Sequence, residues 1–165
     1  MAESEISHYL RKSLLIDTNI FLLIVIGTVD KSLISTFKRT NTFSSEDYDR
    51  LIEFLLLFDH YVITPNILTE VSNFLGQLSE PKRSEAFVTL GLLISKLVEI
   101  YVPSVTVAKS PNLIKYGLTD STVIDNASNG VLTLTDDFGL YGKLKVSGKD
   151  AINFNHLRTI QPFSQ

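Results

Sequence analysis

The stretch Ser13-Leu14-Leu15-Ile16-Asp17-Thr18-Asn19 sets the expected fold of this chain. Its apolar residues form a short run, which is typical of a strand buried on both faces of a parallel sheet. Asp17 follows directly after the run. A charged carboxylate beside a buried element is unfavourable unless a positively charged group lies close to it. We therefore predict a parallel strand over residues 13–16 with a functional carboxylate at its end.

Strand-like and helix-like segments alternate along the rest of the chain. This alternation predicts an α/β fold with a mostly parallel central sheet. Ligands of such sheets bind outside the carboxyl ends of the strands. The expected strands are 13–16, 61–63, 100–102, 131–135 and 151–154. The expected helices are 21–26, 45–58, 65–78, 84–98 and one that begins at Asp120, capped by Thr119, and stops at Gly130. On the fourth helix the expected inward residues are Phe87, Leu90, Ile94 and Leu97.

The composition predicts one globular domain over residues 1–165, with residues 1–12 as a lead-in. A mean hydropathy of +0.18 predicts a well-filled core and an apolar surface for a partner. The net charge of −3 gives no general attraction to nucleic acid, so a polyanion would need local basic groups or metal. The chain has no cysteine, and Asp17 interrupts its most apolar stretch, so we expect a cytoplasmic protein without a membrane span.

Further acidic residues stand beside the other expected elements, namely Glu70, Asp120, Asp136 and Asp137. Taken one at a time, most have ordinary structural explanations: Asp17 as a turn or cap, Asp120 as a favourable charge at a helix N-terminus, and Asp136-Asp137 as a turn. Glu70 differs because it lies near the apolar side of its helix. Since several of these positions should meet at one sheet edge, a divalent cation is the simplest way to satisfy them.

These positions also carry a resemblance to a known family. Leu15-Ile16-Asp17-Thr18-Asn19 resembles the first motif of the PIN-domain nucleases, an apolar strand that ends in Asp-Thr-Asn. Residues 64–71 (TPNILTEV), 117–121 (GLTDS) and 134–140 (LTDDFGL) resemble the helix with the family's Glu, its third motif and its final Thr-x-Asp motif. The four motifs occur in family order and span nearly the whole chain. The segment between Asp17 and Glu70 is longer than in the smallest family members.

The resemblance implies a three-layer α/β/α fold and a ribonuclease that uses Mg²⁺ or Mn²⁺. It implies that Asp17, Glu70, Asp120 and Asp137 are the catalytic, metal-binding carboxylates, with Asp136 as a weaker metal ligand. Asn19 and Thr135 would support them through hydrogen bonds or water. It also implies RNA as substrate, a homodimer, and for many stand-alone members of this size a toxin role with a small antitoxin protein as partner.

Two other functions were weighed from the residues. A catalytically silent binding or scaffold module is the alternative, although the intact acidic set disfavours it. A phospho-acceptor receiver domain would need an early acidic pair and a late strand-end lysine, and neither occurs in the right place.

Candidate phosphate contacts are the lysines that follow the final acidic motif, namely Lys143, Lys145 and Lys149. An ordinary solvated lysine explains each of them equally well. The three histidines, His8, His60 and His156, lack metal-ligand spacing and are expected to be structural or surface residues.

Overall fold

A computed structural model describes residue 9, residues 12–127 and residues 130–159 of the chain. The lead-in and His8 therefore lie largely outside the described residues. The core is one five-stranded sheet in the order β3-β2-β1-β4-β5, and every neighbouring pair is parallel. The strands are β1 (Ser13–Ile16), β2 (Tyr61–Ile63), β3 (Val98–Glu99), β4 (Val131–Thr135) and β5 (Ala151–Asn153).

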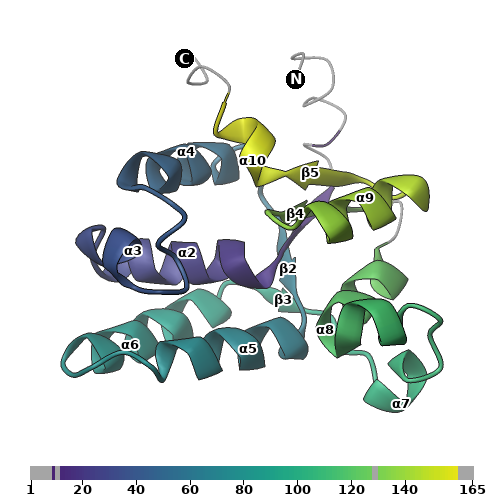
Figure 1. The fold of residues 1–165 in the computed structure, drawn as a ribbon, viewed down its shortest axis with the longest axis horizontal. Coiled ribbons are helices and arrows are strands. Elements are labelled where there is room, and N and C mark those ends of the chain that lie inside the picture. The colour runs from purple at the N-terminus through teal and green to yellow at the C-terminus, as the bar shows by residue number, and fades with distance from the viewer. Residues whose placement is uncertain (1–8, 10–11, 128–129, 160–165) are drawn as a thin grey trace.

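Helices cover both faces of this sheet, which confirms the predicted three-layer α/β/α fold. In Figure 1, α2, α4, α5 and α6 lie on one side of the strands, and α8 and α9 lie on the other. The helices are α2 (Thr18–Val29), α3 (Ser32–Thr36), α4 (Ser45–Leu55), α5 (Pro65–Leu75), α6 (Lys82–Ile94), α7 (Ser104–Val107), α8 (Leu113–Asn126), α9 (Phe138–Val146) and α10 (Phe154–Leu157).

The strand order reverses direction between β1 and β4. The chain runs outward from β1 through β2 to β3, then crosses back to β4 and continues to β5. Because parallel crossovers are right-handed, the two halves place their helices on opposite faces. The carboxyl ends of β1 and β4 therefore flank a topological switch point, where open α/β sheets bind their ligands.

Helix α2 is the central helix of the molecule and is apolar on nearly all sides. It packs against α3, α4, α5 and α6, and its residues from Ile20 to Gly27 are buried. The predicted stop near Gly27 is wrong, since α2 continues to Val29. Gly27 instead makes room for α4, because a Cβ atom there would lie 2.2 Å from the Tyr48 ring.

A Gly27→Ala substitution is expected to destabilise the protein by about 1–3 kcal/mol, because Tyr48 must move to admit the methyl group. Gly91→Ala is the matched control: Gly91 lies inside α6, and a Cβ atom there meets nothing within 4 Å. This control is expected to gain about 0.5–1 kcal/mol from helix propensity. Urea unfolding measures both, and an unchanged free energy of unfolding for Gly27→Ala would contradict the close approach.

Strand β3 is shorter and earlier than predicted. It comprises Val98 and Glu99 instead of residues 100–102, and only one more main-chain bond, from Ile100 N to Ile63 O (2.8 Å), follows it. The reason is that β2 ends at Ile63, where Thr64 caps α5 and leaves no partner for a longer strand. Residues 101–102 therefore emerge from the carboxyl edge of the sheet.

Helix α6 lies earlier in the chain than predicted, and its predicted inward face is right only in part. Leu90 is buried and Leu97, beyond the end of the helix, packs half-buried against the core, as predicted. Phe87 and Ile94 are instead 37% and 36% exposed, and Ala86 is buried. Since apolar residues occur on several faces of this helix, periodicity could not choose among them, and packing against α2 decided. The exposed face supplies apolar surface of the kind that the composition predicted.

Other boundaries also differ. Helix α4, capped by Ser44 in a capping box with Asp47, ends at Leu55 rather than at residue 58, and α5 ends at Leu75 rather than at residue 78. The expected strand 151–154 ends at Asn153, because Phe154 begins α10. Helix α9 was read from the sequence only as a turn at Asp136-Asp137.

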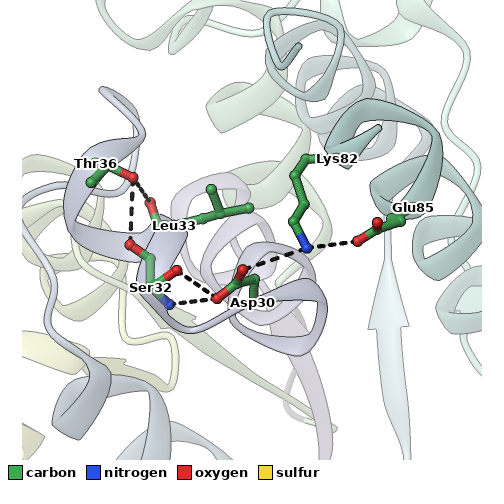
Figure 2. Close-up of polar contacts among 6 residues, drawn as sticks. All are labelled: Asp30, Ser32, Leu33, Thr36, Lys82 and Glu85. Atoms are coloured by element: carbon green, nitrogen blue, oxygen red, sulfur yellow. Dashed lines mark hydrogen bonds and ion pairs between the residues drawn. The ribbon is translucent and has the colours of Figure 1, made fainter. Parts of the chain in front are cut away.

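The turn between α2 and α3 is tied to the start of α6 (Figure 2). The Asp30 carboxylate accepts hydrogen bonds from Ser32 N (2.9 Å) and Ser32 Oγ (2.7 Å), which hold the pKa of Asp30 below its ordinary value. Lys82 Nζ lies 3.4 Å from Asp30 Oδ2 and 2.9 Å from Glu85 Oε2. Both ion pairs are at the surface; the Lys82–Asp30 pair joins the turn to α6, whereas the Lys82–Glu85 pair lies within α6.

In the part of the chain that the structure describes, no helix is both long and apolar enough to cross a membrane.

Candidate active site

The four predicted catalytic acids line one cavity of about 150 Å³ beside the switch point. They come from four separate segments: the end of β1, helix α5, helix α8 and the start of α9. The lining residues are Asp17, Thr18, Asn19, Glu70, Phe74, Asp120 and Asp137. The structure therefore brings together the carboxylates that the sequence scatters.

Asp17 is positioned by the register of the two central strands. Ile16 lies opposite Leu134, and Asp17 N donates to Leu134 O (3.0 Å), so Asp17 comes to lie next to Thr135. Its Oδ2 accepts a hydrogen bond from Thr135 Oγ1 (2.5 Å), and its Oδ1 accepts one from Thr18 N (2.7 Å) at the start of α2. Only 5% of Asp17 is exposed. It is thus a buried carboxylate held on both oxygens.

Glu70 links three helices through two threonine hydroxyls. Thr18 Oγ1 of α2 donates to Glu70 Oε2 (2.8 Å), and Thr119 Oγ1 of α8 donates to Glu70 Oε1 (2.5 Å). The sequence pattern did not identify these two hydroxyls as site residues. Thr18 lies inside the Asp-Thr-Asn motif, and Thr119 directly precedes Asp120, so their proximity to the acids was the available signal.

The prediction that Thr119 caps a helix is wrong. Helix α8 begins earlier, at Leu113, and is kinked at Gly117, whose φ of 73° and ψ of −177° interrupt the helical backbone. This left-handed φ favours glycine, because a Cβ atom would make the conformation unfavourable. The kink places Thr119 and Asp120 just after the break, so the Thr119 hydroxyl is used by Glu70 instead of the helix end.

The pair Asp136-Asp137 is divided between two roles. Asp137 caps α9, since its Oδ1 accepts a hydrogen bond from Leu140 N (2.9 Å), and it lines the cavity. Asp136 accepts a hydrogen bond from Asn19 Nδ2 (3.2 Å), and its main-chain oxygen accepts one from Asn155 Nδ2 (2.8 Å). Asn155 is a third residue that the sequence reasoning missed, and no motif marks it.

Burial and mutual repulsion raise the pKa values of Asp17, Asp120 and Asp136. Burial raises the pKa of Asp17 to about 7, and the charges of Asp120 and Asp136 add to the rise, against the hydrogen bonds that Asp17 accepts. Burial also raises the pKa of Asp120 to about 6, with Asp137 and Glu70 contributing. The pKa of Asp136 is raised by burial too, although the Asn19 hydrogen bond opposes this. The cavity therefore favours protonated acids or a cation.

Within the described ranges, no lysine or arginine forms an ion pair with any of the four acids that line the cavity.

The side chains of the cavity are of the types that bind a divalent cation, but they are not arranged as a metal site in this structure. Carboxylate, amide and hydroxyl oxygens are the ligands that Mg²⁺ and Mn²⁺ prefer. Among the residues described, however, no three Asp, Glu, His or Cys side chains form a group that could hold a metal ion. Both oxygens of Asp17 and of Glu70 already accept hydrogen bonds. Each carboxylate oxygen has two lone pairs, so these single hydrogen bonds leave one lone pair on each oxygen for a metal ion.

The predicted phosphate-binding lysines lie outside the cavity lining. Lys143 and Lys145 occupy the last turn of α9, the end opposite to Asp137. Lys149 donates from Nζ to the main-chain oxygen of Ala127 (2.6 Å). Of the described histidines, His60 is exposed, and His156 is exposed with its ring packed edge-on against Tyr141.

Thr135 should contribute to stability through its hydroxyl. Thr135 Oγ1 donates to Asp17 and accepts from Asp137 N (3.0 Å). We expect Thr135→Val to destabilise the metal-free protein at pH 8 by about 1–3 kcal/mol, because buried polar partners lose their hydrogen bonds. The matched control is Thr133→Val on the same strand, since the buried Thr133 Oγ1 has no hydrogen-bond partner.

The control is expected to be neutral or stabilising by about 1 kcal/mol. Chemical denaturation measures both variants. Equal effects of the two substitutions would show that the Thr135 hydroxyl contributes nothing specific.

No protein-family model matches this chain, and no curated protein is significantly similar to it. Its function is therefore inferred from the residues of the cavity themselves.

Proposed function

We propose that this protein is a metal-dependent endoribonuclease of the PIN type that hydrolyses phosphodiester bonds of RNA. The observation that carries the proposal is the cavity at the switch point, where Asp17, Glu70, Asp120 and Asp137 meet and where no described lysine or arginine pairs with them. The four motifs that resemble the PIN-domain nucleases each contribute one of these acids. Acids of this kind, gathered at a ligand-binding sheet edge, suit phosphodiester hydrolysis better than a purely structural role.

Within this proposal, each residue has a defined task. Asp17, Glu70, Asp120 and Asp137 would hold Mg²⁺ or Mn²⁺, with Asp136 as an additional ligand. Such an ion, when bound, polarises a phosphate oxygen and lowers the pKa of water. Thr135 keeps Asp17 oriented, while Thr18 and Thr119 do the same for Glu70. Asn19 orients Asp136.

The partners expected from the resemblance belong to the same proposal. They are an RNA substrate, a second copy of the chain, and an antitoxin protein if the enzyme acts as a toxin in the cytoplasm. The exposed apolar side chains of α6 offer surface for such association. Light scattering during size-exclusion chromatography would show a dimer or a monomer.

The proposal is tested by incubating the purified protein with labelled structured and unstructured RNAs and either Mg²⁺ or Mn²⁺. We expect internal cleavage that EDTA stops and that Asp17→Asn and Asp120→Asn both remove, while circular dichroism shows an unchanged fold. Cleavage by either variant at the wild-type rate would refute the assignment. If the folded wild-type protein binds RNA but never cleaves it, the silent binding module is the correct function.

A further inference from the structure

A second groove adjoins the acidic cavity and shares Glu70 with it. This groove has a volume of about 240 Å³, which is ample for one nucleobase. It is lined by Pro65, Asn66, Thr69, Glu70, Tyr101, Val102, Ser104 and Thr119. The Thr119 hydroxyl of the groove is bonded to Glu70, the residue that lines both hollows. We call the second hollow the Tyr101 groove.

The Tyr101 groove owes its aromatic wall to the short β3 strand. Because β3 ends at Glu99, the next residues leave the sheet at its carboxyl edge, the edge where ligands bind in parallel sheets. Tyr101 is 71% exposed there. Its ring is therefore accessible to a ligand in the groove. Pro103 follows with φ −57° and ψ 130° and keeps this connection extended.

Apart from Glu70, the polar side chains that line the groove are uncharged, and two of them are available to a ligand. The half-buried Asn66 amide and the Ser104 hydroxyl form no hydrogen bond with any described residue, whereas the Thr69 hydroxyl bonds to Pro65 O (2.8 Å). Glu70 is the sole charged residue among the lining residues, and no lysine or arginine is present to hold a phosphate. The groove therefore suits an uncharged, planar ligand with hydrogen-bonding edges.

We propose that the Tyr101 groove is a nucleobase subsite, in which an unpaired base of the substrate stacks on Tyr101 while the Asn66 amide bonds to its edge. Aromatic side chains bind unstacked bases in this way, and an amide can pair with a base through two hydrogen bonds. This inference rests on the proposed function for its substrate. It adds that the base binds beside Glu70, and that a base held within a duplex cannot enter the subsite.

The subsite can be tested without metal and without cleavage, by using uncharged nucleosides. Titration of the ¹⁵N-labelled full-length protein with adenosine, guanosine, cytidine or uridine in EDTA should shift the amide resonances of Tyr101 and the side-chain amide of Asn66. Ribose alone should shift neither. Nucleoside titrations that leave the resonances of the groove unmoved would overturn the proposal.

Nucleoside binding by substituted proteins is the second test of the subsite. We expect Tyr101→Ala to weaken nucleoside binding at least about tenfold, and Tyr101→Phe to retain it, because stacking needs the ring and not the hydroxyl. Asn66→Ala should alter the preference among the four bases. The control is Ile114→Ala, since Ile114 is 99% exposed and lies outside the groove lining. A Tyr101→Ala protein that binds nucleosides like the wild type would refute the subsite.

The outcome of these binding tests can be distinguished from the outcome of the test of the proposed function. If the protein binds nucleosides at Tyr101 but does not cleave RNA with Mg²⁺ or Mn²⁺, the subsite proposal stands and the nuclease proposal is wrong. If it cleaves RNA but does not bind nucleosides, the nuclease proposal stands and the subsite proposal is wrong. In an active enzyme, Tyr101→Ala should raise KM more than it lowers kcat, and Tyr101→Phe should restore KM.

Discussion

Asp17→Asn is expected to stabilise the metal-free protein at pH 8 while it removes RNA cleavage. The pKa of Asp17 is raised to about 7, which corresponds to a cost of the order of 4 kcal/mol for keeping this carboxylate charged in the folded state. Asparagine has nearly the same shape and no charge. Its oxygen can still accept from Thr18 N, and its amide can donate to the Thr135 hydroxyl.

The sign of the pH dependence follows from the direction of the shift. Because the folded protein holds the Asp17 proton more tightly than the unfolded chain does, stability falls as the pH rises from the unfolded pKa of 3.8 to the folded value of about 7. Burial of Asp120, with its pKa raised to about 6, acts in the same direction. The wild type should therefore be more stable at pH 5 than at pH 8, and the variant should lose less stability across this interval.

Urea unfolding in EDTA at pH 5 and pH 8 measures this difference. We expect Asp17→Asn to gain about 2 kcal/mol over the wild type at pH 8 and almost nothing at pH 5, since the amide recovers part of the cost. Asp59→Asn is the matched control, because Asp59 is exposed and precedes β2 at the opposite edge of the sheet. In cleavage assays with metal, Asp17→Asn should lose at least about a hundredfold in rate. A destabilised but active variant would contradict both expectations.

Adding Mn²⁺ is expected to raise the melting temperature of the wild-type protein by about 5–10 °C at a hundredfold excess over its dissociation constant. Binding to the folded state alone contributes about 2.7 kcal/mol at this excess, and each kcal/mol shifts the midpoint of a chain of this size by about 2–4 °C. The physical reason is that the ion meets carboxylates that otherwise repel one another in a buried cavity.

Differential scanning fluorimetry at pH 8, with and without Mn²⁺, measures the shift. Asp17→Asn and Asp120→Asn should lose most of it, while Asp59→Asn should keep it. The shift should also shrink at pH 5, because protons compete for the same oxygens. If the wild type and Asp17→Asn respond equally, the ion binds elsewhere.

The positions of three strands could be predicted from the sequence because they depend on local chemistry. The apolar run before Asp17 and the run at residues 131–135 are strands with the predicted boundaries, as is 61–63. Thr64 and Pro65 likewise begin α5 as their cap and first-turn preferences predict. These signals lie within a few residues, so no tertiary contact had to be known.

The errors have a common origin in contacts between distant segments. Gly27 looked like a helix end, but α2 continues through it because the Tyr48 ring of α4 packs against it. Phe87 looked like core, but packing on α2 selected the neighbouring face of α6. Thr119 looked like a cap, but the kink at Gly117 directs its hydroxyl to Glu70.

The sequence by itself identified the four carboxylates that line the cavity, because each lies in a short local motif and the motifs occur in one order along the chain. It also determined the layered α/β fold, through the alternation of strands and helices. Only the tertiary structure decided how the acids are held. The register of β1 on β4 placed Thr135 on Asp17, and helix packing brought two threonine hydroxyls to Glu70. Such pairings depend on distances between segments far apart in the chain, which local patterns do not encode.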